Sequence, residues 1–157
     1  MQYNNITQIK LWILLIITEE TDMIKLIVGV KGTGKTKQLI ELVSQALNTT
    51  NGDVVCIEKG DKLRFDVNYR CRLVDTEAFG VTDAASLYGF VAGILASNHD
   101  VTDVFIDSAL KICQEDTAAF DEFLKKADGI AEKNDAKLVI TASIPAENVT
   151  ETMKQYI

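Results

Sequence analysis

The stretch Gly29-Val30-Lys31-Gly32-Thr33-Gly34-Lys35-Thr36 follows the apolar run Ile24-Lys25-Leu26-Ile27-Val28. It matches the pattern G-x-x-x-x-G-K-[ST] at every fixed position, and this pattern is typical of a loop that wraps around phosphate groups. Glycine allows the backbone to adopt the conformations that such a wrap requires. A β-prone run before the stretch and a helical pattern after it give the expected strand–loop–helix setting. The sequence therefore predicts that residues 29–36 bind the phosphates of a nucleotide.

Each part of this loop has a physical role. Its successive backbone N–H groups would point at an anion, and the following helix N-terminus adds roughly half a positive charge. Lys35 would reach the β- and γ-phosphates as the catalytic cation, and the Thr36 hydroxyl would hold Mg²⁺. The alternative is a glycine-rich turn without a ligand. The four fixed positions should coincide by chance in fewer than about one in a hundred chains of this length, which favours the phosphate loop.

Size and composition set limits on the class of protein. A length of 157 residues predicts one domain. The net charge of −7 and the scattered lysines give no strong signal for a nucleic-acid surface. No apolar run is long enough to span a membrane. Three cysteines without a C-x-x-C pair are interpreted as reduced core residues of a cytoplasmic protein: Cys56, Cys71 and Cys113.

The first 22 residues differ from the rest of the chain. Their apolar run 11–17 is seven residues long, and acidic residues follow it. We expect residues 1–22 to be an N-terminal extension that is poorly ordered or not native, because Met23 directly precedes the first strand. Residues 23–157 would then form the nucleotide-binding domain. The alternative is an extra strand in residues 1–22, paired as a hairpin beside residues 24–28 and covering a sheet edge.

Strands and helices are expected to alternate along the domain. Buried strands are predicted at 24–28, 53–58, 101–107 and 138–143, with helices at 37–48, 83–97 and 120–131. Two further short strands are predicted at 63–67 and 69–75. Gly89 and Gly93 are expected to pack closely against the sheet, and a closing helix is expected from Pro145 through Tyr156. This order predicts an α/β fold in three layers, with a mostly parallel central sheet and helices on both faces.

Asp107 ends an apolar strand well downstream of the phosphate loop, which is the Walker B arrangement. A carboxylate there would lie at the carboxyl edge of the sheet, beside Thr36, where it can orient Mg²⁺. The alternative is that Asp107 caps a helix that runs through Ser108-Ala109-Leu110. The phosphate loop upstream favours the magnesium role.

The loop at 29–36 and Asp107 make the chain resemble the P-loop NTPases, over roughly residues 23–145. In particular the chain resembles their additional-strand division, which includes RecA-like and AAA ATPases, and it is similar to small uncharacterised bacterial ATP-binding proteins. This resemblance implies that the strand 138–143 lies between the phosphate-loop strand and the Asp107 strand. It also implies that Ser143 or Thr141 occupies a polar position near the γ-phosphate.

Two features depart from that family pattern. The related ATPases usually place a Glu after the Walker B Asp to orient the attacking water, whereas this chain has Ser108. Glu58 is a candidate substitute, and the alternative is that Glu58 is a solvated acid at the edge of a loop. No arginine follows Arg72, so the three arginines at 64, 70 and 72 would act in cis, act on a neighbouring subunit, or lie on an exposed face.

These observations predict a protein that binds ATP and Mg²⁺ and hydrolyses ATP slowly or only with a partner. One alternative is a small-molecule or nucleotide kinase. Another is a non-catalytic switch or assembly subunit, in which nucleotide occupancy orders a surface for a second copy of the chain or for another protein. The sequence predicts the phosphate site more sharply than it predicts the reaction.

Overall fold

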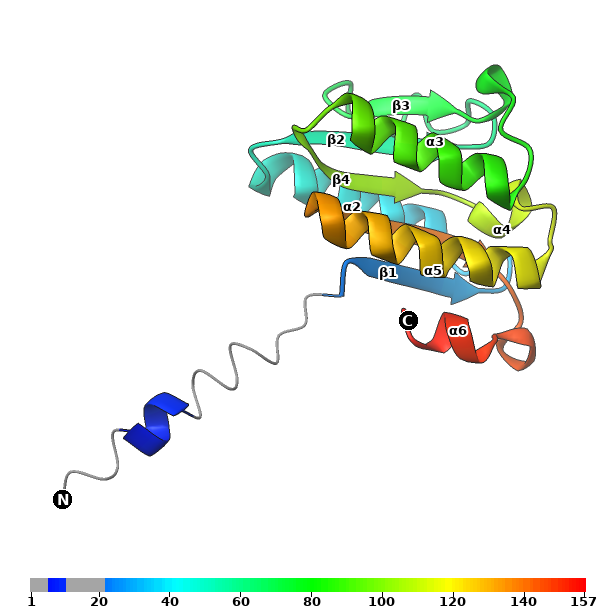
Figure 1. Cartoon of the computed structure of the whole chain (residues 1–157). Coiled ribbons are helices and arrows are strands. Elements are labelled where there is room, and N and C mark those ends of the chain that lie inside the picture. The colour runs from blue at the N-terminus through cyan, green and yellow to red at the C-terminus, as the bar shows by residue number, and fades with distance from the viewer. Residues whose placement is uncertain (1–5, 11–21) are drawn as a thin grey trace.

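The computed structural model describes residues 6–10 and 22–157. Its centre is a five-stranded sheet in which every neighbouring pair of strands is parallel (Figure 1). The order across the sheet is β1-β5-β4-β2-β3. The bounds of the strands are β1 Ile24–Gly29, β2 Asp53–Glu58, β3 Arg72–Asp75, β4 Val101–Ile106 and β5 Lys137–Ser143.

Helices cover both faces of the sheet. In Figure 1, α2 lies behind the sheet, and α3 and α5 lie in front of it. The helices are α2 Lys35–Thr49, α3 Ala84–Ser97, α4 Ala109–Ile112, α5 Thr117–Asn134 and α6 Glu151–Lys154, with short 3₁₀ turns η1 Glu77–Phe79 and η2 Ala146–Asn148. This is a three-layer α/β fold, as predicted, and the sheet is parallel throughout.

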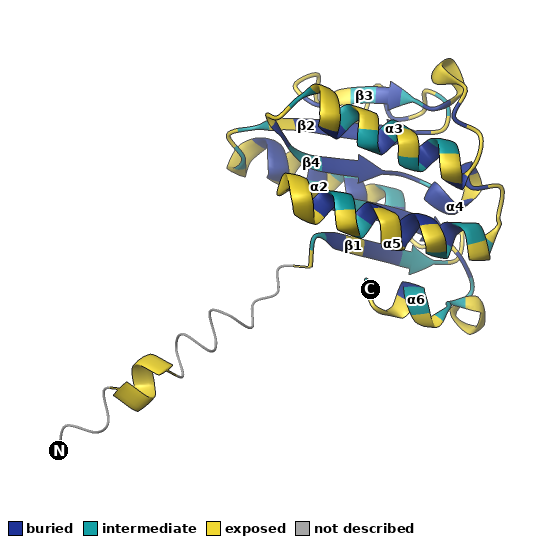
Figure 2. Cartoon of the chain, viewed as in Figure 1, coloured by how far each residue is buried: buried dark blue, intermediate teal, exposed yellow. Residues whose placement is uncertain are grey.

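The alternation of side chains along each strand supplies a core on each face of the sheet. In β2, Val54 and Cys56 join the cluster under α2, whereas Val55 and Ile57 join the larger cluster under α3 and α5. Successive side chains of a strand point to opposite faces, so a strand covered on both sides is apolar at nearly every position. Figure 2 shows this distribution, with buried strands between helices whose outer faces are exposed.

The strand order brings the predicted site residues to one edge of the sheet. β5 lies between β1 and β4, as the family resemblance implied, and β2 pairs with β4 on the other side. The loop after β1, Glu58 at the end of β2 and Asp107 after β4 therefore lie at the same carboxyl edge. Crevices outside the carboxyl ends of parallel strands are where ligands bind in open α/β sheets.

The prediction of two strands at 63–67 and 69–75 was wrong for most of that segment, because only Arg72–Asp75 forms a strand. The Leu63 carbonyl accepts hydrogen bonds from the backbone N–H groups of Asp66 and Val67, both at 3.0 Å. These local bonds produce a turn. The apparent alternation arises because Leu63 is buried as an anchor of the turn, whereas Phe65 is 84% exposed.

The prediction that Gly89 and Gly93 pack against the sheet was also wrong. Both are exposed, and a Cβ built at either position meets no atom within 4 Å. The face of α3 that contacts the sheet carries Leu87, Val91 and Leu95, which recur every four residues. Gly89 and Gly93 are each two positions away from these residues. In a helix that turns every 3.6 residues, they therefore lie on the opposite side, away from the sheet.

The closing helix is shorter than predicted. α6 spans only Glu151–Lys154, and Pro145 precedes η2 with an extended ψ of 148°. Met153 is buried, as expected for the apolar side of this segment. The Tyr156 carbonyl accepts a 2.7 Å hydrogen bond from the Leu26 N–H, so the C-terminal segment lies against the outer side of β1.

The prediction of an extension or an extra strand in residues 1–22 falls largely outside the described residues. Within that segment, residues 6–10 form a short exposed helical segment. Of the helices that the structure describes, none combines the length and apolar character needed to cross a bilayer.

Candidate functional site

The loop between β1 and α2 has the backbone conformation that its glycines predict. Gly32 and Gly34 adopt positive φ values of 86° and 85°, in the left-handed region that penalises a Cβ. At Gly29 a Cβ would lie 2.7 Å from the Thr33 hydroxyl oxygen, which donates a 2.8 Å hydrogen bond to the Val30 carbonyl. The small residues and the Thr33 hydrogen bond therefore allow the loop to close on itself.

The N-terminus of α2 opens onto this loop without a side-chain cap. Gly34 occupies the capping position and offers no side chain, and the first turn of the helix contains no acidic residue. The first intrahelical bond runs from the Gln38 N–H to the Gly34 carbonyl at 3.0 Å. The N–H groups that precede Gln38 and the positive end of the helix dipole are therefore available to an anion.

Lys35 lies over the loop and is only 9% exposed. Its Nζ donates a 2.8 Å hydrogen bond to the Val30 carbonyl and lies 3.5 Å from the Thr33 hydroxyl. No carboxylate neutralises this ammonium group among the ion pairs of the described residues. A buried cation without an acid partner is suited to bind an anionic ligand.

Asp107 forms the second half of the site and is 9% exposed. The Thr36 hydroxyl lies 3.2 and 3.3 Å from its two carboxylate oxygens. The Thr141 hydroxyl, 1% exposed in β5, donates a 2.7 Å hydrogen bond to Asp107 Oδ1 and accepts one from the Ser108 N–H at 2.8 Å. Side chains from two elements, α2 and β5, therefore hold this carboxylate beside the loop 29–36.

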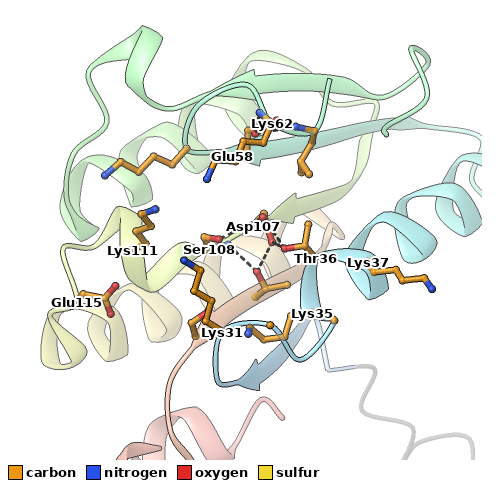
Figure 3. A pocket seen from close by; sticks show the side chains of 16 residues that line it. Lys31, Lys35, Thr36, Lys37, Glu58, Lys62, Asp107, Ser108, Lys111 and Glu115 are labelled. Carbon is orange, nitrogen blue, oxygen red and sulfur yellow. Dashed lines mark hydrogen bonds between the residues drawn. The ribbon is translucent and has the colours of Figure 1, made fainter. Parts of the chain in front are cut away.

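The alternative role of Asp107 as a helix cap does not match this geometry. The position that caps α4 is Ser108, which has a φ of 55° and makes no side-chain capping bond. The carboxylate of Asp107 instead turns toward Thr36 and Thr141 (Figure 3). A left-handed conformation is uncommon for a non-glycine residue and tends to persist where the surroundings enforce it, here through the bond to Thr141.

These residues line one cleft of about 610 Å³. Its size falls within the range of roughly 300–1,000 Å³ that is usual for small-molecule and cofactor sites. Figure 3 shows the loop on one side and the end of β2 on the other, with Asp107 between them. The lining residues are Lys31, Gly32, Gly34, Lys35, Thr36, Lys37, Glu58, Lys59, Lys62, Leu63, Asp107, Ser108, Lys111, Glu115, Thr141 and Ser143.

Glu58 also lines the cleft but is held by its own loop. It is 3% exposed, so it is not a solvated acid at a loop edge. Its Oε1 accepts a 2.8 Å hydrogen bond from the Lys62 N–H, and its Oε2 accepts one from the Leu63 N–H at 3.1 Å. Burial raises the pKa of Glu58 above its ordinary value, the two backbone amides oppose that rise, and the charge of Asp107 adds to it.

The donor set beside the loop fits a magnesium ion. Thr36 and Asp107 supply a hydroxyl and a carboxylate, the hard oxygen donors that Mg²⁺ prefers. Proteins typically hold Mg²⁺ through one or two side chains and leave its other positions to phosphates and water. The pair of side chains at the mouth of the loop 29–36 matches that requirement.

Other predicted residues differ in how they relate to the cleft. Ser143 lines it and is exposed at the end of β5. The three arginines do not line it. The Arg64 guanidinium lies 3.6 Å from the carboxylate of Asp61, and Arg70 donates a 3.0 Å hydrogen bond to the Leu47 carbonyl.

Five charged residues of the cleft were not predicted from the sequence: Lys37, Lys59, Lys62, Lys111 and Glu115. Lys59 and Lys62 follow the end of β2, and Lys111 follows Asp107 by four positions. A sequence signal for them exists, because residues that follow the ends of parallel strands meet at one edge of the sheet. Their convergence depends on the strand order, which the spacing of the residues alone does not determine.

Comparison with known proteins adds no family assignment. A scan against protein-family models found no match, and neither did a search of curated proteins. The functional argument therefore depends on the residues of the cleft and their geometry.

Proposed function

We propose that this chain binds a nucleoside triphosphate, ATP, together with Mg²⁺, as a P-loop NTPase of the additional-strand type in the cytoplasm. The observation that carries the proposal is the meeting of Thr36 with Asp107 at the mouth of the loop 29–36, at 3.2 Å between the hydroxyl and the carboxylate. These residues are 71 positions apart in the sequence. A glycine-rich turn without a ligand would not need a carboxylate beside it.

Each residue of the cleft has a part in this proposal. The backbone N–H groups of the loop and the N-terminus of α2 bind the phosphates, and Lys35 balances their charge. Thr36 and Asp107 hold the metal, which supplies Lewis-acid stabilisation of phosphate charge when bound. Thr141 keeps the Asp107 carboxylate in position through its 2.7 Å hydrogen bond.

The same cleft supports slow hydrolysis better than fast hydrolysis. Ser108 stands where the related ATPases have a glutamate, and both oxygens of Glu58 accept backbone hydrogen bonds. A general base must lie within hydrogen-bond reach of the proton that it takes, and these bonds hold the Glu58 carboxylate toward its own turn. Turnover would therefore be slow, or would depend on a partner that supplies or frees such a group.

A nucleotide switch is the second candidate, and the hydrogen bonds of Glu58 favour it. The Glu58 carboxylate, which accepts these bonds, lines the cleft. The N–H groups that donate them belong to Lys62 and Leu63, in the turn after β2. A ligand that changed the position of Glu58 would change that turn, whose outer surface is exposed. In this case occupancy, and not turnover, would be the functional signal.

Phosphate release from Mg²⁺-ATP by the purified chain distinguishes these functions, with Lys35→Ala as the variant. We expect slow release by the wild type and loss of release in the variant. No release despite nucleotide binding would contradict the hydrolase and favour the switch, or a kinase that transfers phosphate to an acceptor. A nucleotide-dependent change in oligomeric state without release would identify the switch.

A further inference from the structure

The cleft carries more positive charge than the proposed nucleotide site uses. Six of its lining residues are lysines and three are acids, whereas the whole chain has a net charge of −7. Of these lysines, Lys31 and Lys35 belong to the phosphate loop, and Lys37 follows it in α2. Three others come from outside it: Lys59 and Lys62 from the turn after β2, and Lys111 from α4.

These three lysines belong to segments other than the phosphate loop. Figure 3 shows Lys62 on the side of the cleft opposite Lys35, and it shows Lys111 on α4. They come from two segments that are far apart in the sequence and that only the pairing of β2 with β4 brings together. Like charges brought together raise the energy of the free protein, so such a cluster is expected where an anion binds.

Among the described residues, no acid forms an ion pair with Lys59, Lys62 or Lys111. In the part of the chain that the structure describes, the ion pairs join Arg64 to Asp61, Lys125 to Glu122 and Lys154 to Glu151. The carboxylate of Glu58, which directly precedes Lys59, accepts backbone hydrogen bonds, and that of Asp61, beside Lys62, pairs with Arg64. Glu115, which lines the cleft four residues after Lys111, joins none of these ion pairs. The ammonium groups of Lys59, Lys62 and Lys111 therefore remain available to a ligand.

We propose that Lys59, Lys62 and Lys111 bind a phosphate group of a second ligand, which occupies the cleft beside the nucleotide. This inference rests on the proposed nucleotide site, because the loop 29–36 takes the phosphates of the nucleotide. Lysine is a compact point charge that binds phosphate without a fixed orientation, and a phosphate monoester carries a charge of about −1.5 to −2 at pH 7. A phosphate group therefore neutralises more of the positive charge of three lysines than a ligand with a single carboxylate would.

The test uses the full chain and inorganic phosphate as the probe. The protein is first saturated with Mg²⁺ and a non-hydrolysable ATP analogue, and phosphate is then titrated by calorimetry at constant ionic strength. The cleft variant is Lys59→Ala, Lys62→Ala, Lys111→Ala. A matched control variant is Lys25→Ala, Lys133→Ala, Lys137→Ala, which removes the same charge from exposed positions outside the cleft.

We expect phosphate to bind the nucleotide-saturated wild type and the control variant. Affinity for phosphate should fall about tenfold in the cleft variant, because each exposed ion pair contributes a few-fold in affinity. The affinity for the ATP analogue should change by less than about threefold in both variants.

Three outcomes would overturn the proposal. One is that phosphate does not bind the nucleotide-saturated wild type at millimolar concentrations. The second is that the control variant loses as much affinity for phosphate as the cleft variant. The third is that the cleft variant loses affinity for the ATP analogue but not for ADP, which would assign the lysines to the terminal phosphate of the nucleotide. If the analogue does not bind the wild type at all, the proposed function fails first and this inference fails with it.

Discussion

The hydroxyl of Thr141 joins two groups of the candidate site, and replacing it with the methyl of valine tests that role. Thr141→Val keeps the shape of the side chain but removes the 2.7 Å bond to Asp107 and the 2.8 Å bond from the Ser108 N–H. Thr141 is 1% exposed, so water has little access to replace either bond. The variant leaves a carboxylate oxygen and a backbone N–H with one partner fewer.

The size of the effect follows from these two bonds. A hydrogen bond to a charged group contributes about 1.5–3 kcal/mol, and a buried donor left without a partner costs about 1–3 kcal/mol. The added methyl group offsets part of this loss, so we expect the free energy of unfolding to fall by about 3 kcal/mol. With a slope of about 2 kcal/mol per molar urea, the midpoint of unfolding would fall by about 1.5 M.

Urea unfolding at neutral pH measures this change, with Thr141→Ser as the control. The serine variant keeps the hydroxyl and loses one buried methyl group, which costs about 1 kcal/mol. The valine variant should therefore be less stable than the serine variant by about 2 kcal/mol. Equal stabilities of the two variants would show that the hydroxyl does not hold Asp107 in the way described.

Four further predictions concern other parts of the fold. Gly89→Ala should raise the free energy of unfolding by about 0.5–1 kcal/mol, because a Cβ at this exposed position of α3 meets no atom. Gly52→Ala should lower it by about 1–3 kcal/mol, since a Cβ there overlaps the Asp100 carbonyl; thermal unfolding compares the two, and equal effects would contradict the packing. Burial raises the pKa of the Cys71 thiol to about 11 and that of the Cys113 thiol to about 12. At pH 8 these thiols should therefore react with Ellman's reagent far more slowly in the native protein than in the unfolded chain, and a fast reaction of the native protein would contradict their burial. Because the pKa of Glu58 is raised on folding, its contribution to stability is fully present below its ordinary pKa of 4.5 and is lost as the pH rises above that value. The free energy of unfolding, measured from pH 4 to 7, should therefore fall less with rising pH in Glu58→Gln than in the wild type. An unchanged pH dependence would refute this.

The loop and the strand order could be predicted because their signals are local or tied to chemistry. The glycines of residues 29–36 determine the backbone conformation of the loop. Asp107 ends a strand, and its proposed role in binding Mg²⁺ requires that strand to lie near Thr36. The resemblance to additional-strand proteins then implied the place of β5 between β1 and β4, which the structure confirms.

The remaining features could not be predicted from the sequence because they depend on tertiary contacts. An alternation of apolar residues at 63–67 is compatible with a strand, but Leu63 is held by Glu58 and the segment turns. Gly89 and Gly93 are small enough for close packing, but the sheet selects the Leu87 side of α3. The lysines after β2 and on α4 converge only because these segments end at the same edge of the sheet.

The central claim is that the loop 29–36 binds the phosphates of ATP with Mg²⁺, and an equilibrium titration of ATP in the presence and absence of Mg²⁺ tests it most directly. The titration compares the wild type with Lys35→Ala and with Lys133→Ala, an exposed lysine of α5 outside the cleft. We predict Mg²⁺-dependent binding that is weakened at least about tenfold in Lys35→Ala, since a charge-assisted bond in a buried site contributes about 1.5–3 kcal/mol. Binding should be unchanged in Lys133→Ala. Equal affinities of the two variants, or no binding by the wild type, would contradict the account.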